Sequence, residues 1–192
     1  MDNHIIAQQL NARLHLERPP LGPAFVQEPP SHVARAAPGA PSACTFWRLA
    51  EHGVFYADAA DHRECPIGLL TMGFPASEAD AARAQQTVQL FAELDYFSPD
   101  EVANLPTVST PHAGIVYGPL ADLPCPPDVV LVLVSPAQGM LLAESAGSTA
   151  LRQEPELAAM GRPACAAIPR ALRAGQTTLS LGCIGAHVRG YP

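Results

Sequence analysis

The pattern of apolar residues near the start of the chain predicts a helix and then a short strand. Ile6, Leu10 and Leu14 are four residues apart, so they predict one buried stripe on a helix that ends before the Pro-Pro pair that follows. The next apolar run, Leu21 to Val26, is short and predicts a strand. From Glu28 to Ser42 the chain is rich in proline, alanine and glycine, which indicates an extended connection.

Polar residues placed before apolar runs predict where further helices begin. The sequence Ser77-Glu-Ala-Asp80 is a capping box, and it predicts the longest helix of the chain. Ser135 and Pro136 predict another helix that runs to about Ala146. We expect the buried face of the longest helix to consist of Ala79, Ala82, Val88, Phe91 and Leu94.

Two further predicted helices carry a cysteine in the first turn. Ser42 can cap a helix that contains Cys44, while Pro163 and Gly175 bracket a helix that contains Cys165 near its start. The positive end of a helix dipole favours a thiolate, which is the form of cysteine that binds metals and attacks electrophiles. Both positions therefore suit a reactive or metal-binding thiol.

The remaining predicted strands are short and run over Val54 to Tyr56, Ile115 to Pro119 and Thr177 to Leu181. Val129 to Val134 is apolar at every position, as in a central strand that is covered on both faces. A strand followed directly by a helix favours an α/β fold, in which helices pack against a mixed sheet. We expect one compact domain over residues 1–192, with an α+β arrangement as the alternative.

The charge of the chain argues against partners that need a basic surface. The formal net charge is −7 and the pI is near 5.4, so we expect no binding to nucleic acid or to an anionic membrane. All 11 basic residues are arginines, and they are scattered along the chain. The absence of lysine excludes a Schiff-base lysine, a pyridoxal-phosphate anchor and a phosphate-binding P-loop.

The beginning of the chain shows no basic leader followed by an apolar run, and no apolar stretch approaches the roughly 20 residues that span a bilayer. We therefore expect a cytoplasmic protein. The chain has five cysteines. In a reducing compartment an odd number of cysteines favours metal ligands, catalytic thiols or core residues over disulfides.

Four of the cysteines lie where predicted elements begin or turn. Cys44 and Cys165 lie in first helical turns, Cys65 precedes a proline, and Cys183 lies in a Gly-Cys-Ile-Gly sequence. A cysteine followed by proline is one known form of iron–sulfur ligand. The separations of 21, 100 and 18 residues fit no zinc-finger or ferredoxin rule, so a joint site has to be assembled by the fold. The alternative is that each is a small buried apolar residue.

A series of short motifs runs through nearly the whole chain. In order they are Arg18-Pro19-Pro20, Cys44-Thr-Phe-Trp-Arg-Leu-Ala, Cys65-Pro-Ile-Gly, Tyr117-Gly-Pro-Leu120, Pro127-Asp-Val-Val, Ser135-Pro-Ala-Gln138, Gly161-Arg-Pro-Ala-Cys165 and Gly182-Cys183-Ile-Gly185. This order resembles a bacterial and archaeal family catalogued as a domain of unknown function, number one-six-nine. The resemblance implies that the family's cysteines match Cys44, Cys65, Cys165 and Cys183, with no counterpart for Cys125. It implies no established activity.

Four thiolates that meet at one point would hold a [4Fe–4S] cluster or a tetrahedral zinc ion. We favour the iron–sulfur cluster, because separated turns flanked by glycine and proline can donate backbone N–H bonds to cluster sulfides, whereas zinc more often uses closely spaced pairs of ligands. The expected function is electron transfer or redox sensing with a redox partner protein or a small molecule. Self-association is also open.

The residues near the cysteines leave other interpretations open. His62 and His187 could replace or support a thiolate ligand, or could be solvent-exposed, and Cys125 is interpreted as a neutral loop thiol rather than a haem ligand. Two alternative functions remain. One is a small-molecule binding or interaction module with a structural zinc or no metal, and the other is an enzyme that uses the thiol of Cys65 or Cys183.

Overall fold

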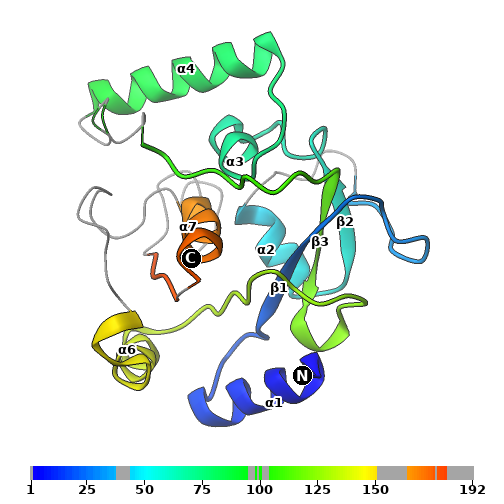
Figure 1. Ribbon diagram of the computed structural model, residues 1–192, viewed down its shortest axis with the longest axis vertical. Coiled ribbons are helices and arrows are strands. Elements are labelled where there is room, and N and C mark those ends of the chain that lie inside the picture. Colours follow the sequence, from blue (N-terminus) through cyan, green and yellow to red (C-terminus); the bar gives the residue numbers. More distant parts are fainter. Residues whose placement is uncertain are drawn as a thin grey trace.

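Three antiparallel strands form a sheet at the centre of the computed structural model, and helices lie around it (Figure 1). The structure describes residues 2–37, 44–94, 98, 100, 104–150, 164–175 and 177–180, with the backbone alone for Cys44 and for residues 146–150. Strand β3 (Gly114–Pro119) lies between β1 (Leu21–Val26) and β2 (Phe55–Asp58).

The predicted combination of helices and a sheet is confirmed, in its α+β form. Both neighbours of β3 run antiparallel to it, with Leu21 opposite Pro119 and Phe55 opposite Tyr117. Among the described residues, the only parallel pairing is the isolated bridge between Arg35 and Tyr56. All six residues of β3 are buried, so this strand has the central position that the sequence assigned to residues 129–134.

Residues 129–134 form an extended segment beside β1 with a single bridge, between Leu131 and Leu21. The backbone N–H and C=O groups of these two residues exchange hydrogen bonds of 2.8 and 2.9 Å. The next hydrogen-bonded positions along this edge of β1 are Pro19 and Pro23, and neither has an N–H group to donate. The predicted strand is therefore wrong, because prolines on its neighbour stop the ladder on both sides of one residue.

The two faces of the sheet contribute to two separate apolar clusters. The larger cluster includes Leu21, Ile115 and Tyr117, and the second includes Ala24 and Val116, which alternate with them along the strands. Helix α2 (Cys44–Ala50) and α3 (Pro66–Thr71) supply residues to the larger cluster. Helix α1 (Asn3–Leu14) and the 3-10 turn η1 (Leu120–Asp122) cover the other face.

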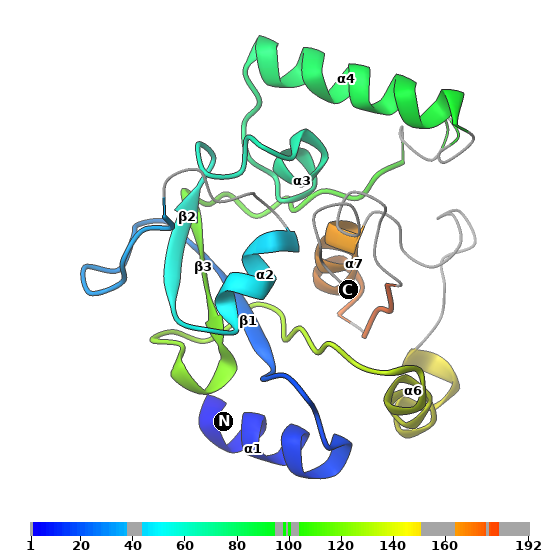
Figure 2. The same ribbon diagram turned by 180° about the vertical axis from the view of Figure 1, so that it is seen from behind.

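Helix α1 ends before the Pro-Pro pair and α6 (Pro136–Ala150) begins at Pro136, as the sequence predicts, but α6 extends beyond the predicted end near Ala146. Asp2 caps α1 by accepting the N–H of His4 at 2.8 Å, and Ser135 and Gln138 exchange hydrogen bonds at the start of α6. The Gln138 side chain also donates to the carbonyls of Leu14 and His15, which fastens α6 to the end of α1 (Figure 2).

Helix α4 (Glu78–Glu93) is the longest described helix, and it packs against α3 at one end of the molecule. Its capping box is present, because Ser77 and Asp80 exchange backbone and side-chain hydrogen bonds. The predicted buried face is wrong in its first half: Asp80 and Ala84 are the buried residues, and Ala79 and Ala82 are exposed. Further along, Val88 and Phe91 are half-buried and Leu94 is exposed. The capping carboxylate of Asp80 also lies 3.6 Å from Arg63, which turns that side of the helix towards the body.

The last described elements are the 3-10 turn η2 (Ala164–Ala166) and helix α7 (Ala167–Ala174). Gly175 ends α7 in the left-handed conformation with a φ of +60°, as the sequence predicts. Residues 177–180 form no strand, and the Thr178 hydroxyl instead donates to the Ala167 carbonyl. Leu181 lies outside the described residues.

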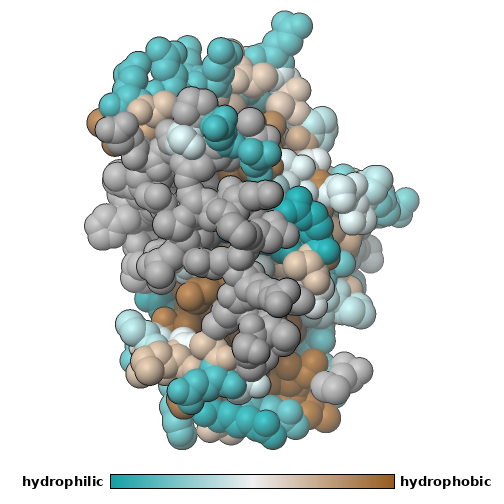
Figure 3. Space-filling view, turned by 60° about the vertical axis from the view of Figure 1, so that its left-hand side comes forward, coloured by the Kyte–Doolittle hydropathy of each residue, from teal (hydrophilic) through white to brown (hydrophobic). Residues whose placement is uncertain are grey.

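The surface of the molecule is mostly polar at the two ends formed by α4 and α1 (Figure 3). In the described part of the chain, every helix is too short or too polar to cross a bilayer.

Candidate functional site

His62 and Tyr117 form a hydrogen-bonded pair inside the larger apolar cluster. His62 follows β2, has no exposed surface, and lies with Nδ1 2.6 Å from the Asp58 carbonyl. Its Nε2 lies 3.0 Å from the Tyr117 hydroxyl. Because a carbonyl oxygen can only accept, Nδ1 carries the proton and Nε2 accepts the hydroxyl hydrogen.

Aromatic rings surround this histidine. Its ring centroid is 5.0 Å from that of Phe46, in an edge contact, and 4.6 Å from that of Phe74. Burial lowers the pKa of His62 to about 4, so the ring is neutral at physiological pH. The interpretation of His62 as an exposed loop residue is therefore wrong. With both nitrogens bonded, the ring offers none to a metal or a thiolate.

Cys65 lies three residues after His62 and caps helix α3. Its Sγ accepts a hydrogen bond from the Gly68 N–H at 3.4 Å, and its own N–H donates to the His62 carbonyl. Pro66 occupies the first helical position, where a missing N–H leaves no bond unmade. The side chain is half-buried, so the sequence places this thiol in a turn with a backbone N–H directed at its sulfur.

Cys165 lies in η2, at the start of α7, and is 5% exposed. It belongs to the same apolar cluster as Phe46 of α2 and Leu69 of α3. The turn η2 packs directly against α3, the helix that Cys65 caps. The fold thus brings together two cysteine-bearing segments that are 100 residues apart in the sequence.

The other predicted ligands are described less fully. Cys44 is the first residue of α2, and the ribbon views show this end of α2 directed towards α3 and α7 (Figures 1 and 2). Cys183 and His187 lie outside the described residues. Within the described ranges, no three side chains of His, Cys, Asp or Glu come together in a way that could hold a metal ion.

Cys125 packs on the other face of the sheet from Cys165. It lies in a loop against the second apolar cluster and is half-buried. Burial, and then the negative charge of Asp128, raise the pKa of the Cys125 thiol. These surroundings favour a neutral thiol, as the sequence interpretation expected.

A protein-family model matches most of this chain. The model of DUF169, described as Uncharacterised ArCR, COG2043, matches residues 9–190. This chain belongs to the DUF169 family. The resemblance that the order of motifs indicated is therefore confirmed, and DUF169 comes with no described activity. No curated protein and no solved structure matches the chain.

Sequence reasoning did not predict the His62–Tyr117 pair in this DUF169 chain. The two residues are 55 positions apart, and no motif spacing connects them. The available signal was a tyrosine in the apolar run of β3, because a buried tyrosine hydroxyl needs a polar partner.

Proposed function

We propose that this protein binds a [4Fe–4S] cluster through Cys44, Cys65, Cys165 and Cys183, and that it uses the cluster for electron transfer or redox sensing. The observation that carries the proposal is the contact between α3 and η2, since these segments hold Cys65 and Cys165. The same proposal implies a cytoplasmic location, where free thiols stay reduced.

The surroundings of these two cysteines suit a thiolate-bound cluster. The Gly68 N–H already points at the Cys65 sulfur, and N–H bonds to sulfur are one means by which proteins adjust the potential of iron–sulfur centres. Cys165 lies in an apolar region that excludes water. The neighbouring His62 is neutral and bonded at both nitrogens, so cysteine sulfur is the stronger donor in this region.

Purification without oxygen, followed by assays of iron, zinc and acid-labile sulfide and by a visible absorption spectrum, tests the proposal. We expect iron and sulfide in equal amounts, with broad visible absorption that bleaches on reduction. Single Cys→Ser changes at Cys44, Cys65, Cys165 and Cys183 should each remove the colour. Cys125→Ser is the matched control and should keep it, because Cys125 lies on the other face of the sheet.

Other results of these assays would favour one of the alternative functions. Zinc without iron or sulfide would indicate a structural metal in a binding module. A folded protein with no metal would contradict both metal-binding versions. In that protein, one cysteine that reacts rapidly with an alkylating probe at neutral pH would favour an enzyme that uses Cys65 or Cys183.

A further inference from the structure

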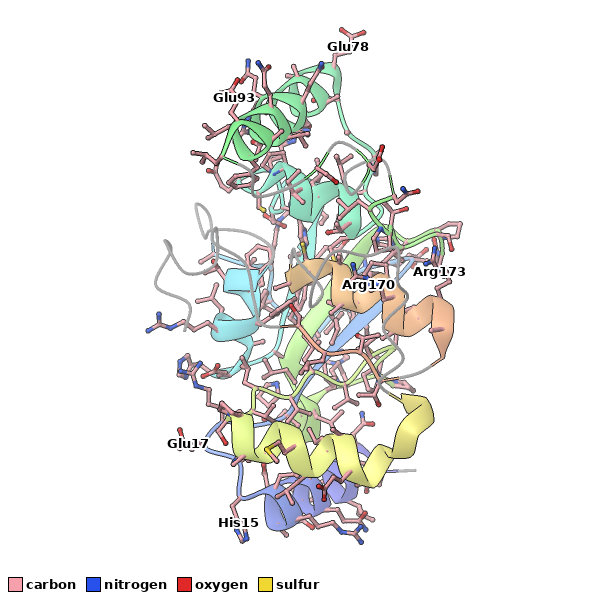
Figure 4. All side chains as sticks on the ribbon, turned by 90° about the vertical axis from the view of Figure 1, so that its left-hand side faces the viewer. His15, Glu17, Glu78, Glu93, Arg170 and Arg173 are labelled. Carbon is pink, nitrogen blue, oxygen red and sulfur yellow. The ribbon has the colours of Figure 1, made fainter. Side chains whose placement is uncertain are left out.

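Helix α6 exposes two large apolar side chains next to each other. Met140 is 66% exposed and Leu141 is 55% exposed. Every residue from 136 to 145 is at least partly exposed, and in the described part of the chain no other helix or strand packs extensively against α6. Figure 4 shows α6 lengthwise, on the side of the molecule that faces the viewer.

The most exposed apolar residues belong to one face of this helix. Ala137, Met140, Leu141 and Glu144 are all exposed, and they follow the spacing i, i+3, i+4 and i+7 that places residues on one side of an α-helix. The half-buried residues of α6 lie on the opposite side. In a surface helix this spacing normally marks the stripe that is buried, so the exposed face has the pattern of a contact surface.

The two ends of this face carry opposite charge. Glu144 is the only charged residue of α6, and none of the ion pairs between described residues includes it. Ala137 lies in the first turn, where the free N–H groups of a helix give a partial positive charge. Met140 and Leu141 lie between these two ends, so the face matches itself when it is turned end over end.

We propose that this face binds the same face of a second copy of the chain, with the two α6 helices antiparallel about a two-fold axis at the level between Met140 and Leu141. Each of these two side chains then packs against its counterpart in the other copy. Glu144 of each copy meets the positive end of the other helix at Ala137. A parallel pairing would instead place the two Glu144 carboxylates side by side, which like charges oppose.

The size of this contact and the charge of the chain decide how strong the dimer is. Two helices alone bury less than the roughly 1,200 Å² of a standard stable complex, so we expect a dissociation constant in the micromolar range, about 1–100 μM. Each copy has a net charge of −7, and the repulsion between copies weakens as salt is added. The dimer should therefore become stronger at higher ionic strength.

Sedimentation velocity of the full chain over a range of about 1–500 μM tests the proposal. We expect a monomer–dimer equilibrium that Leu141→Glu weakens at least about tenfold, because the change places a charge in the apolar centre of the contact. Leu90→Glu on α4 is the matched control, since Leu90 is 53% exposed, and it should leave the dimer unchanged. Urea unfolding of both variants verifies that they are folded.

A charge exchange tests the antiparallel arrangement. Ala137→Glu should weaken the dimer, because the new carboxylate faces Glu144 of the other copy. Adding Glu144→Arg to Ala137→Glu should restore it, because positions 137 and 144 are two turns apart within one helix but face each other across the axis. An unrestored dimer would contradict this arrangement.

Two other results would overturn the proposed contact. One is a chain that stays monomeric at about 500 μM, and the other is a dimer that Leu90→Glu and Leu141→Glu weaken equally. The contact does not depend on the proposed cluster, so iron and sulfide are assayed in the same samples. A dimer that needs Leu141 in a protein without iron would support the contact and contradict the cluster, and a monomer with iron and sulfide would do the reverse.

Discussion

The hydroxyl of Tyr117 lies 3.0 Å from Nε2 of His62, and this contact fixes a neutral histidine in one tautomer inside the core. The other ring nitrogen donates to the Asp58 carbonyl, so both polar atoms of the ring are satisfied without water. The pair joins the central strand β3 to the loop that leads to Cys65. A change in the charge or bonding of His62 should therefore disturb the start of α3, where the Cys65 N–H donates to the His62 carbonyl.

Acid should destabilise the protein through His62. Its pKa is about 4 in the folded protein and about 6.5 when unfolded, so the unfolded chain binds more protons between these values. The free energy of unfolding should fall by about 3 kcal/mol from this residue as the pH drops from 7 to 4, and the loss should level off below 4. Urea unfolding at a series of pH values measures it.

The His62→Gln variant isolates this contribution. Glutamine keeps hydrogen-bonding groups but does not titrate, so the variant should lose less stability than the wild type over the same pH range. Carboxylates elsewhere affect both proteins alike. Parallel curves for the two proteins would show that His62 is not the source of the acid sensitivity.

Removal of the Tyr117 hydroxyl should destabilise the fold. Tyr117→Phe leaves Nε2 of His62 buried without its donor, which costs about 1–3 kcal/mol. Chemical denaturation measures the change. Tyr56→Phe removes a hydroxyl from another buried ring of the same sheet, and an equal loss there would mean that the pairing with His62 has no special weight.

A side chain at position 114 should be poorly tolerated. A Cβ atom on Gly114 would overlap the ring of Tyr56 on the neighbouring strand, so Gly114→Ala should cost about 1–3 kcal/mol in unfolding free energy. Gly53→Ala is the control, because a Cβ there meets no atom within 4 Å, and it should change stability by less than about 0.5 kcal/mol. If the clash is the cause, Tyr56→Ala should make Gly114→Ala less costly.

Cys125 should react slowly with iodoacetamide at neutral pH. Burial and the charge of Asp128 raise the pKa of its thiol, and the protonated form is a poor nucleophile. Mass spectrometry of the peptide that contains Cys125 follows the rate as pH rises. Asp128→Asn removes the negative charge and should shift the rate profile to lower pH, whereas an unchanged profile would leave burial as the whole cause.

The local signals in the sequence predicted the fold where they act over a few residues. The strand over Leu21–Val26, the capping box at Ser77 and the glycine cap at Gly175 are all confirmed. Each depends on the conformation of a short segment and on little else. The same reasoning placed Cys65 and Cys165 at the ends of elements, where the structure has them.

Those local signals could not predict contacts between segments that are distant in the sequence. The run Val129 to Val134 has the composition of a central strand, but the prolines of the facing strand decide its pairing. Asp80 lies on the buried side of α4 although its side chain is polar, because its carboxylate forms the capping box of the helix. Whether the four proposed cysteine ligands meet is a question of the same kind, because it depends on how distant segments pack.

The edges of the sheet bear on how this protein behaves when concentrated. On the outer side of β1, Pro19 and Pro23 have no N–H, while those of Leu21 and Phe25 bond to Leu131 and Asp128. On the outer side of β2, the residue before and the residue after Arg35 bond to the backbone of Tyr56. A neighbouring molecule therefore finds no open strand to extend in the described sheet, which guards the native state against strand-by-strand aggregation.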